Sequence, residues 1–453
     1  MVFFVRRSRT KNTTSHFIEL SAKEVPLTTN TIPHIVIVGS GFGGLKAAQA
    51  LAKAAVHVTL LDRHNYHLFQ PLLYQVATAG VSPDEIAYPV HAIFRRQKNL
   101  EFRLAEVSGF DPANRRLFTS AGELGYDALI LAVGSTTNFF ELDEVEKNAL
   151  KLKHLEDAEA IRNHILQQVE LAVQEPDLAL RRARLTFVVA GGGPTGVETA
   201  GALSELMRLV LHKDYAHLDP TEIRILLLEA ADRLIPVFSP RLSAKAFSAL
   251  VKKGVEVRFN TPVSSYDGTR VTLKSGEMIA ARTLIWAAGM RASPLLQRLG
   301  TPLEAQGRVK VLPTLQVPEH PEIFAIGDAV YLEDSQGRSL PQLAPVAMQQ
   351  GEAAAHNALS YLAGGPLQPF VYKDPGNLAT IGRNQAVASL WGLELSGFVA
   401  WFLWVAVHIL RLIGFRSRIL VMIEWIRDYL FYNGAVLIIS NPVLDNPGPF
   451  KKP

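Results

Sequence analysis

The sequence HIVIVGSGFGG occupies residues 34–44 and joins an apolar strand to a glycine-rich turn. A continuous apolar run that ends at glycine is typical of a strand covered on both faces of a parallel sheet. An alanine-rich helix is predicted next, over residues 45–54, and a second strand over 56–61 ends at Asp62. Strand, glycine turn, helix, strand and acid in this order predict a βαβ unit of the kind that binds dinucleotides.

The same pattern occurs a second time farther along the chain. An apolar strand at 185–189 leads into GGGPTG at 191–196, a helix beginning near Val197, and a strand at 223–228 that ends at Glu229. The repeat predicts two dinucleotide-binding modules in one chain.

Three further apolar strands close on small residues, at 128–134, 283–289 and 323–328. Their interleaving with the two modules indicates that the second module is inserted into the first, to which the chain returns after about residue 285. We therefore expect an α/β fold with two Rossmann-like domains and a C-terminal helical segment.

The composition excludes several kinds of chemistry. None of the 453 residues is a cysteine, so the chain has no thiolate to form a disulfide, to ligate zinc or an iron–sulfur cluster, or to act as a redox dithiol. We predict no metal site. The formal charge of +4 is concentrated at the two ends of the chain, which leaves a nearly neutral body and argues against a nucleic-acid-binding face.

The glycines of the first module have separate tasks. Gly39 permits the tight turn, Gly41 lets the backbone approach a pyrophosphate, and Gly44 allows close packing of helix on strand. Phosphates are expected at the helix N-terminus, where backbone N–H groups and the helix dipole favour anions. Asp62 is placed to accept hydrogen bonds from a ribose.

Glu229 has the equivalent place in the second module. A carboxylate there accepts a hydrogen bond from the 2′-hydroxyl of NAD and repels the 2′-phosphate of NADP, so NADH is the expected substrate. Arg233 is close enough in sequence to leave NADPH open as an alternative.

The two modules and the sequence IFAIGD at 323–328 resemble the two-dinucleotide-binding-domain FAD/NAD(P) flavoprotein disulfide reductase superfamily. The resemblance implies that Asp328 binds the ribityl or pyrophosphate part of FAD, with a turn or helix cap as the alternative role. The implied FAD-binding residues are Gly39, Gly41, Phe42, Gly43, Gly44, Asp62, Arg63, Val107, Ala132, Gly134, Gly327 and Asp328. The implied NAD-binding residues are Gly191, Gly193, Pro194, Thr195, Gly196, Glu229, Ala288 and Gly289.

Four more segments are similar to type II NADH:quinone oxidoreductases, the single-subunit respiratory NADH dehydrogenases that pump no protons. They are NYHLFQPLLYQVA at 65–77, AMQQG at 347–351, LATIG at 378–382 and the tail at 408–429. The resemblance implies that NADH reduces FAD, NAD leaves, and a membrane quinone, ubiquinone or menaquinone, takes the electrons in a non-electrogenic reaction. We also expect a homodimer at the cytoplasmic face of the inner membrane. Disulfide reductases and sulfide:quinone reductases of related architecture need a thiol, which this chain lacks.

Two catalytic residues follow from the resemblance. Glu198 matches the family glutamate near flavin and quinone that is implicated in proton supply, although a glutamate that only complements a helix N-terminus is the alternative. Gln349 matches the last glutamine of the quinone-site pattern Ala-Gln-x-Ala-x-Gln, with a plain helix-surface glutamine as its alternative. Pro345 replaces the first glutamine of that pattern, which leaves the type of quinone open.

The tail has the composition of a membrane-surface segment. The apolar run at 395–410 is shorter than the ~20 residues that span a bilayer, and arginines follow it. Tryptophans and flanking arginines favour a position among lipid headgroups. The tryptophans of this region are Trp391, Trp401, Trp404 and Trp425. His408 is expected to be packed or interfacial.

The next segment is predicted to be an amphipathic helix at the membrane surface or between subunits. Its charged face is predicted to hold Glu424, Arg427 and Asp428. Its apolar face is predicted to hold Ile419, Met422, Ile423, Ile426 and Leu430.

These observations divide the chain into six parts: a flexible extension (1–30), an FAD-binding domain in two pieces (31–150 and 285–390), an NADH-binding domain (151–284), an anchoring or dimerisation segment (391–440) and a disordered tail (441–453). Two other functions stay open. One is a soluble reductase for a ferredoxin or rubredoxin, and the other is a binding protein that responds to NADH.

Overall fold

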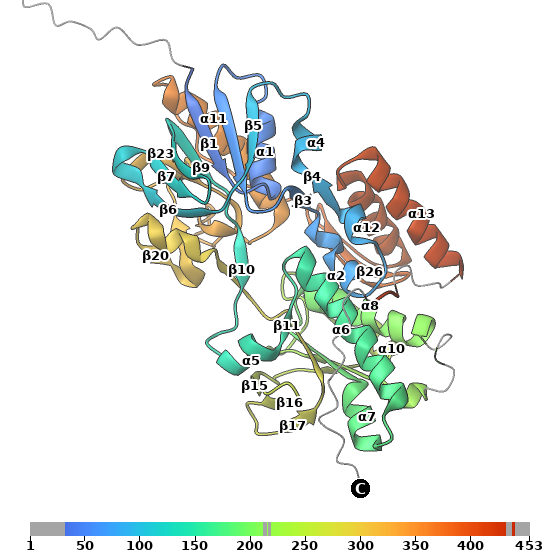
Figure 1. Ribbon diagram of the computed structural model, residues 1–453. Coiled ribbons are helices and arrows are strands. Elements are labelled where there is room, and N and C mark those ends of the chain that lie inside the picture. Colours follow the sequence, from blue (N-terminus) through green and yellow to red (C-terminus); the bar gives the residue numbers. More distant parts are fainter. Residues whose placement is uncertain (1–31, 212–214, 216–218, 432–436, 440–453) are drawn as a thin grey trace, which may run out of the picture. The chain divides into compact units, whose positions relative to one another are not determined.

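The computed structural model of the chain describes residues 32–211, 215, 219–431 and 437–439 (Figure 1). The predicted flexible extension at 1–30 and the predicted disordered tail at 441–453 lie outside the described residues.

A six-stranded sheet carries the first glycine turn, in the order β22-β23-β9-β1-β2-β5. Every neighbouring pair is parallel except β22–β23. The strands are β1 His34–Val38, β2 His57–Asp62, β5 Leu100–Leu104, β9 Ala128–Leu131, β22 Gln316–Val317 and β23 His320–Ala325. The predicted strands at 34–38, 56–61, 128–134 and 323–328 are thus confirmed as neighbours in one sheet, with shifted ends.

Helix α1 (Phe42–Ala50) follows β1 directly. It begins three residues before the predicted start at Leu45, because the residues after Gly41 already adopt helical geometry. It also ends before Ala54, the predicted end. Helix α11 (Ala344–Leu362) packs against α1 so closely that a Cβ atom on Gly351 would overlap the carbonyl oxygen of Gly43. This contact ties the late part of the chain to the first glycine turn.

The second sheet is entirely parallel and has the order β11-β18-β12-β13-β14. Its strands are β11 Leu150–Lys151, β12 Thr186–Ala190, β13 Arg224–Leu228, β14 Val255–Arg258 and β18 Thr283–Trp286. Its helices are α6 Leu155–Gln174, α8 Pro194–Glu205 and α10 Pro240–Lys252. The predicted second module is confirmed, and helix α8 begins three residues before the expected Val197.

Two short strands mark the passage between the sheets. β10 (Ser135–Thr137) leads away from the first sheet and pairs antiparallel with β19 (Met290–Ala292), on which the chain returns. The chain therefore leaves and re-enters the first module side by side, as an inserted module requires.

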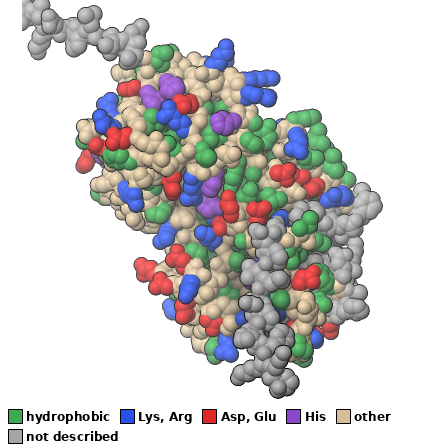
Figure 2. Space-filling model, viewed as in Figure 1, with side chains coloured by type: hydrophobic (Ala, Val, Ile, Leu, Met, Phe, Trp, Pro, Cys, Tyr) green, Lys and Arg blue, Asp and Glu red, His purple; other side chains and the backbone are tan. Residues whose placement is uncertain are grey.

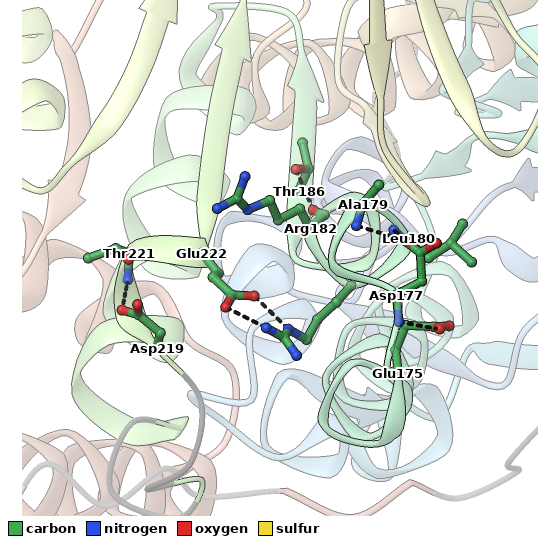
Figure 3. A network of polar contacts seen from close by, with 10 residues as sticks. Glu175, Asp177, Ala179, Leu180, Arg182, Thr186, Asp219, Thr221 and Glu222 are labelled. Atoms are coloured by element: carbon green, nitrogen blue, oxygen red, sulfur yellow. Dashed lines mark hydrogen bonds and ion pairs between the residues drawn. The ribbon is translucent and has the colours of Figure 1, made fainter.

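A network of polar contacts holds the entry into β12 (Figure 3). Helix α7 (Leu178–Arg184) is capped by Asp177, whose carboxylate accepts N–H hydrogen bonds at 2.7 and 3.0 Å. Arg181 binds Glu222, just before β13, through two hydrogen bonds of 2.7 and 2.9 Å. The hydroxyl of Thr186 donates to the carbonyl oxygen of Arg182 at 2.7 Å. These contacts align β12 and β13 at the end opposite the glycine turn.

The apolar run at 395–410 is divided between two elements, a strand and a helix. Its first residues belong to β27 (Leu393–Gly397) of a three-stranded antiparallel sheet with β25 (Asn377–Gly382) and β26 (Gln385–Leu390). This sheet packs on α8 of the second module, where a Cβ atom on Gly201 would overlap the Ile381 carbonyl oxygen. The remainder forms helix α12 (Phe398–Arg411).

Helix α13 (Phe415–Phe431) follows and reverses part of the predicted amphipathic pattern. The Glu424 side chain is 17% exposed and faces inward to Glu85, whereas Met422, Ile423 and Ile426 are exposed. Burial and the hydrogen bond from Glu424 raise the pKa of Glu85 to about 8, so this carboxyl pair can share a proton. The structure does not describe the side chains of Asp428 and Leu430.

The remaining elements connect these layers. They are β3 Tyr66–Leu68, α2 Leu73–Ala77, α3 Pro83–Ile86, β4 Ala87–Pro89, α4 Val90–Phe94, β6 Val107–Asp111, β7 Arg116–Thr119, β8 Gly122–Gly125, α5 Asp143–Asn148, β15 Val263–Tyr266, β16 Arg270–Leu273, β17 Met278–Ala280, β20 Leu303–Glu304, β21 Arg308–Lys310 and β24 Val330–Tyr331. None of the helices within the described ranges is long and apolar enough to cross a membrane.

Candidate active site

A cleft of about 660 Å³ opens where β1, β2 and β9 end. It contains most of the residues expected to bind FAD: Gly39, Gly41, Phe42, Gly43, Asp62, Arg63, Val107, Ala132, Gly134, Gly327 and Asp328. Thr195 and Glu198 of α8 line the same cleft. The structure thus brings residues of both modules to one cavity.

Gly44 is the one expected FAD-binding residue that does not line the cleft. A Cβ atom there would overlap the carbonyl oxygen of Gly39, so its part is close packing of α1 on the turn. Gly39 has φ +103°, which favours glycine. A Cβ atom on Gly41 would meet no protein atom within 4 Å, so the space beside it is open to a ligand.

Asp62 holds the turn in place from the end of β2. Its Oδ2 accepts hydrogen bonds from the backbone N–H of Ser40 at 2.6 Å and from the Ser40 hydroxyl at 2.8 Å. Its Oδ1 accepts from the N–H of His64 at 2.8 Å. A carboxylate accepts about four hydrogen bonds, so one acceptor position of Asp62 is left for a ribose hydroxyl.

Asp328 belongs to a cluster that the sequence did not reveal. The Ser135 hydroxyl donates to Asp328 Oδ2 at 2.5 Å, and Lys153 Nζ donates to the Ser135 oxygen at 3.0 Å. Lys153 is followed by α6 of the second module, and burial lowers the pKa of its ammonium group. Both Ser135 and Lys153 line the cleft. No spacing signal in the sequence predicts that Lys153 reaches this cavity.

Two buried side chains beside the glycine turn have unpaired polar atoms. His67 Nδ1 lies 2.9 Å from the Ser40 carbonyl oxygen, and burial lowers the pKa of this imidazole. Because the carbonyl only accepts, Nδ1 carries the proton, and Nε2 is left as an acceptor without a partner in the part of the chain that the structure describes. Gln350 Oε1 accepts from the N–H of Gly327 at 2.7 Å, whereas its Nε2 has no partner among the described residues. Neither of these two side chains lines the cleft. The open glycine turn, the cluster of Ser135, Lys153 and Asp328, and a cleft of this size fit a large polar cofactor such as FAD.

The second glycine turn repeats the geometry of the first. Gly191 has φ +108°, and Glu229 accepts hydrogen bonds from the N–H groups of Gly192 and, at 2.7 Å, Ala231. Arg233 donates to the carbonyl oxygen of Pro236 at 3.0 Å. Of the residues expected to bind NAD, Thr195 lines the 660 Å³ cleft, and the others lie outside its lining.

Glu198 lies deeper in α8 than expected. The helix begins at Pro194, so Glu198 is past the first turn and does not serve the helix N-terminus. Burial raises the pKa of its carboxyl to about 8, against the opposing effects of the Thr380 N–H, 3.4 Å from Oε1, and the Trp404 indole. A carboxyl that lines a cleft and titrates near neutrality can act as a general acid.

Gln349 does not line the cleft, and its expected place at the quinone site stays a prediction. Its side chain makes two hydrogen bonds with the backbone of Lys373, donating to the carbonyl oxygen at 2.8 Å and accepting from the N–H at 3.0 Å. Ala347, two residues earlier on α11, lines the cleft instead. Pro345 occupies the first turn of α11, where a missing N–H removes no helical hydrogen bond.

The tryptophans of the tail differ in environment. Trp391 is 84% exposed, whereas Trp404 is buried and stacks on His408 with 4.1 Å between ring centroids. His408 Nδ1 also lies 2.6 Å from the Trp404 carbonyl oxygen, and burial lowers the pKa of His408 to about 4. His408 is therefore packed, as expected, and Trp404 belongs to the core.

Comparisons with known proteins agree with this arrangement. Residues 33–351 match the pyridine nucleotide-disulphide oxidoreductase family, and residues 375–432 match the NDH2 C-terminal domain. The chain is 36% identical over 422 residues to the type II NADH:quinone oxidoreductase Ndh of Mycobacterium tuberculosis, with 90% of each chain covered. It is 39% identical over 409 residues to NdhA of the same organism, with 86% of each covered.

Among solved structures, NDH2 from Plasmodium falciparum in complex with NADH has a TM-score of 0.82. At 22% identity it covers 90% of this chain and 100% of its own, which shows the shared fold. On the extent of these similarities, the chain belongs to the type II NADH:quinone oxidoreductase family.

Proposed function

We propose that this chain oxidises NADH through bound FAD and reduces a membrane quinone at the 660 Å³ cleft. The observation that carries the proposal is the position of Glu198, a carboxyl of raised pKa on the second module that lines the cleft of the first. The first glycine turn, helix α8 of the second module and a proton donor thereby converge on one cavity.

We propose that FAD occupies the cleft against Gly41, Asp62 and Asp328, and that NADH binds at the turn of Gly193 and Glu229. Bound FAD supplies a two-electron carrier between a hydride donor and a quinone. Lys153, which lines the cleft, offers a hydrogen-bond donor to its polar groups. The FAD domain then consists of the first sheet, α1 and α11, and the NADH domain of the second sheet and its helices.

The stoichiometry of the reaction defines the part of Glu198. NADH delivers a hydride, which is two electrons and one proton, whereas a quinone becomes a quinol by gaining two electrons and two protons. One further proton must come from water. We propose that Glu198 holds this proton in the cleft, donates it, and is then reprotonated from solvent. Gln349 is proposed to lie at the quinone site, with its side chain held by the backbone of Lys373.

The proposal is tested by turnover of the purified, flavin-containing full chain with NADH and a short-chain quinone. We expect NADH-dependent quinol formation and a much lower rate with NADPH, because Glu229 disfavours the 2′-phosphate. Quinone reduction that is no faster than without enzyme would reject the proposal. Efficient turnover with a ferredoxin or rubredoxin alone would favour the soluble-reductase alternative.

The chain is also proposed to dock on a membrane surface through α12 and α13. Hydrophobic side chains gather over these helices (Figure 2). The apolar docking patch consists of the exposed residues Phe398, Val399, Phe402, Leu410, Phe415, Met422, Ile423 and Ile426. Such a patch marks a membrane or protein contact, and a quinone dissolved in lipid favours the membrane. We place it at the cytoplasmic face of the inner membrane, and a homodimer is proposed to share part of this surface.

Charge in the docking patch should abolish membrane binding. For Ile423→Glu combined with Ile426→Glu, we expect vesicle co-sedimentation to fall at least about tenfold, because each buried charge costs several kcal/mol at the acyl boundary. NADH:ferricyanide activity should be retained. Met278→Glu, an equally apolar exposed site on β17, is the matched control. Equal loss of binding in both proteins would contradict docking through α13.

A further inference from the structure

A chain of hydrogen bonds joins the inner face of α13 to the cleft. Trp425 Nε1 of α13 donates to Gln75 Oε1 at 2.8 Å. Gln75 Nε2 donates to the Tyr74 hydroxyl oxygen at 2.8 Å. Gln75 and Tyr74 are neighbours on α2, far from α13 in sequence, and Tyr74 lines the cleft together with Glu198.

The directions of these hydrogen bonds are fixed by chemistry. An indole N–H only donates, so the carbonyl oxygen of the Gln75 amide faces Trp425 and its NH₂ group faces Tyr74. The Tyr74 oxygen accepts from that NH₂, which leaves the hydroxyl proton free of Gln75. Burial raises the pKa of Tyr74 well above its ordinary value, so this hydroxyl stays a donor at neutral pH.

Aromatic packing holds Trp425 in this position. Its ring lies 5.6 Å from Trp404, which stacks on His408, and His408 contacts Phe69 edge-on at 6.2 Å. These ring contacts continue without a break from α13 through α12 to the segment before α2. On other faces of α13, Ile423 and Ile426 of the docking patch are exposed. One helix therefore carries both the docking surface and the end of the hydrogen-bond chain.

We infer that Trp425 and Gln75 are positioning residues, which hold the Tyr74 hydroxyl so that it donates a hydrogen bond to a carbonyl oxygen of the bound quinone. The position of α13 on the membrane then determines where the Tyr74 hydroxyl lies in the quinone site. A quinone carbonyl accepts hydrogen bonds and gains negative charge as electrons arrive, so a fixed donor stabilises the developing charge. This inference rests on the proposed quinone reduction.

The test compares Trp425→Phe, which keeps an aromatic ring and removes the N–H donor, with Tyr74→Phe, which removes the hydroxyl. Both are measured as full chains with bound flavin in quinone-containing vesicles. For Trp425→Phe we expect kcat/KM for quinone to fall about fivefold, and for Tyr74→Phe about tenfold, the usual range for one lost hydrogen bond. NADH:ferricyanide rates and flavin content should stay at native values. Trp391→Phe, the same change at an exposed site, should match the native protein.

The double variant decides whether the two residues act as one chain. If Trp425 acts through Tyr74, Trp425→Phe with Tyr74→Phe is no worse than Tyr74→Phe alone. Each of four results would overturn the inference. The two losses could multiply in the double variant, or a variant could lose as much activity with ferricyanide as with quinone. Tyr74→Phe could lose its flavin, or Trp425→Phe could keep native quinone kinetics. A native protein that reduces no quinone would instead reject the proposed function, so the two failures are distinguishable.

Discussion

Glu198→Gln should lower NADH:quinone turnover by about a hundredfold or more, the usual contribution of a positioned general acid. Glutamine keeps the size and polarity of the side chain and cannot release a proton. Burial raises the pKa of Glu198 to about 8, so the native carboxyl holds its proton at neutral pH. Because a carboxyl loses its proton as the pH rises through its pKa, native turnover should fall on the alkaline side of about pH 8. The variant should lack this alkaline decline.

The measurement is the pH profile of kcat with quinone and, in parallel, with ferricyanide, which accepts electrons without protons. Flavin reduction by NADH should be unchanged in Glu198→Gln, because only the proton step is affected. Glu352→Gln on the exposed side of α11 is the matched control. An unchanged quinone rate, or an alkaline limb that persists in Glu198→Gln, would show that the second proton reaches quinone by another route.

A pair of glycine variants should separate the two nucleotide sites. Gly41 has φ −67° and Gly193 has φ −70°, so alanine is unstrained at both, and a Cβ atom would meet no protein atom within 4 Å at either. If a pyrophosphate lies against each turn, the new methyl group collides with the ligand alone. We expect Gly41→Ala to lose bound FAD and its visible absorbance. Gly193→Ala should keep FAD and lose at least about a hundredfold in kcat/KM for NADH.

Gly44→Ala is the contrasting variant. There the added methyl group overlaps the Gly39 carbonyl oxygen, so the apoprotein itself should be destabilised by about 1–3 kcal/mol. Thermal unfolding of the flavin-free proteins tests the difference: Gly41→Ala should melt like the native chain, and Gly44→Ala at a lower temperature. Retention of FAD in Gly41→Ala with a native spectrum would place the phosphates elsewhere.

The two βαβ modules could be predicted because their signals are local. An apolar strand, a glycine turn, a helix and a terminal acid follow each other within one short segment, as at residues 34–62, and backbone geometry depends on neighbouring residues. The same local rules failed at helix boundaries, since nothing in the residues after Gly41 distinguishes a turn from a first helical turn.

The candidate site was only partly predictable, because some of its residues carry no local signal in the sequence. The family resemblance implies a role for Glu198, and the structure places it on the cleft. Lys153 carries no such signal, because its approach to the cleft depends on the docking of α6. The hydrogen bonds of Gln349 with the backbone of Lys373 likewise depend on a later segment of the chain, and its place at the quinone site stays a prediction.

The tail shows the division between sequence and structure. The sequence alone determined that it is apolar, rich in tryptophan and too short to span a bilayer. Only the tertiary structure decided that Glu424 turns inward to Glu85, that Trp404 is buried, and that Ile423 faces outward. Periodicity defines the faces of a helix, but which face is covered depends on partners from distant parts of the chain, here α3 and α12.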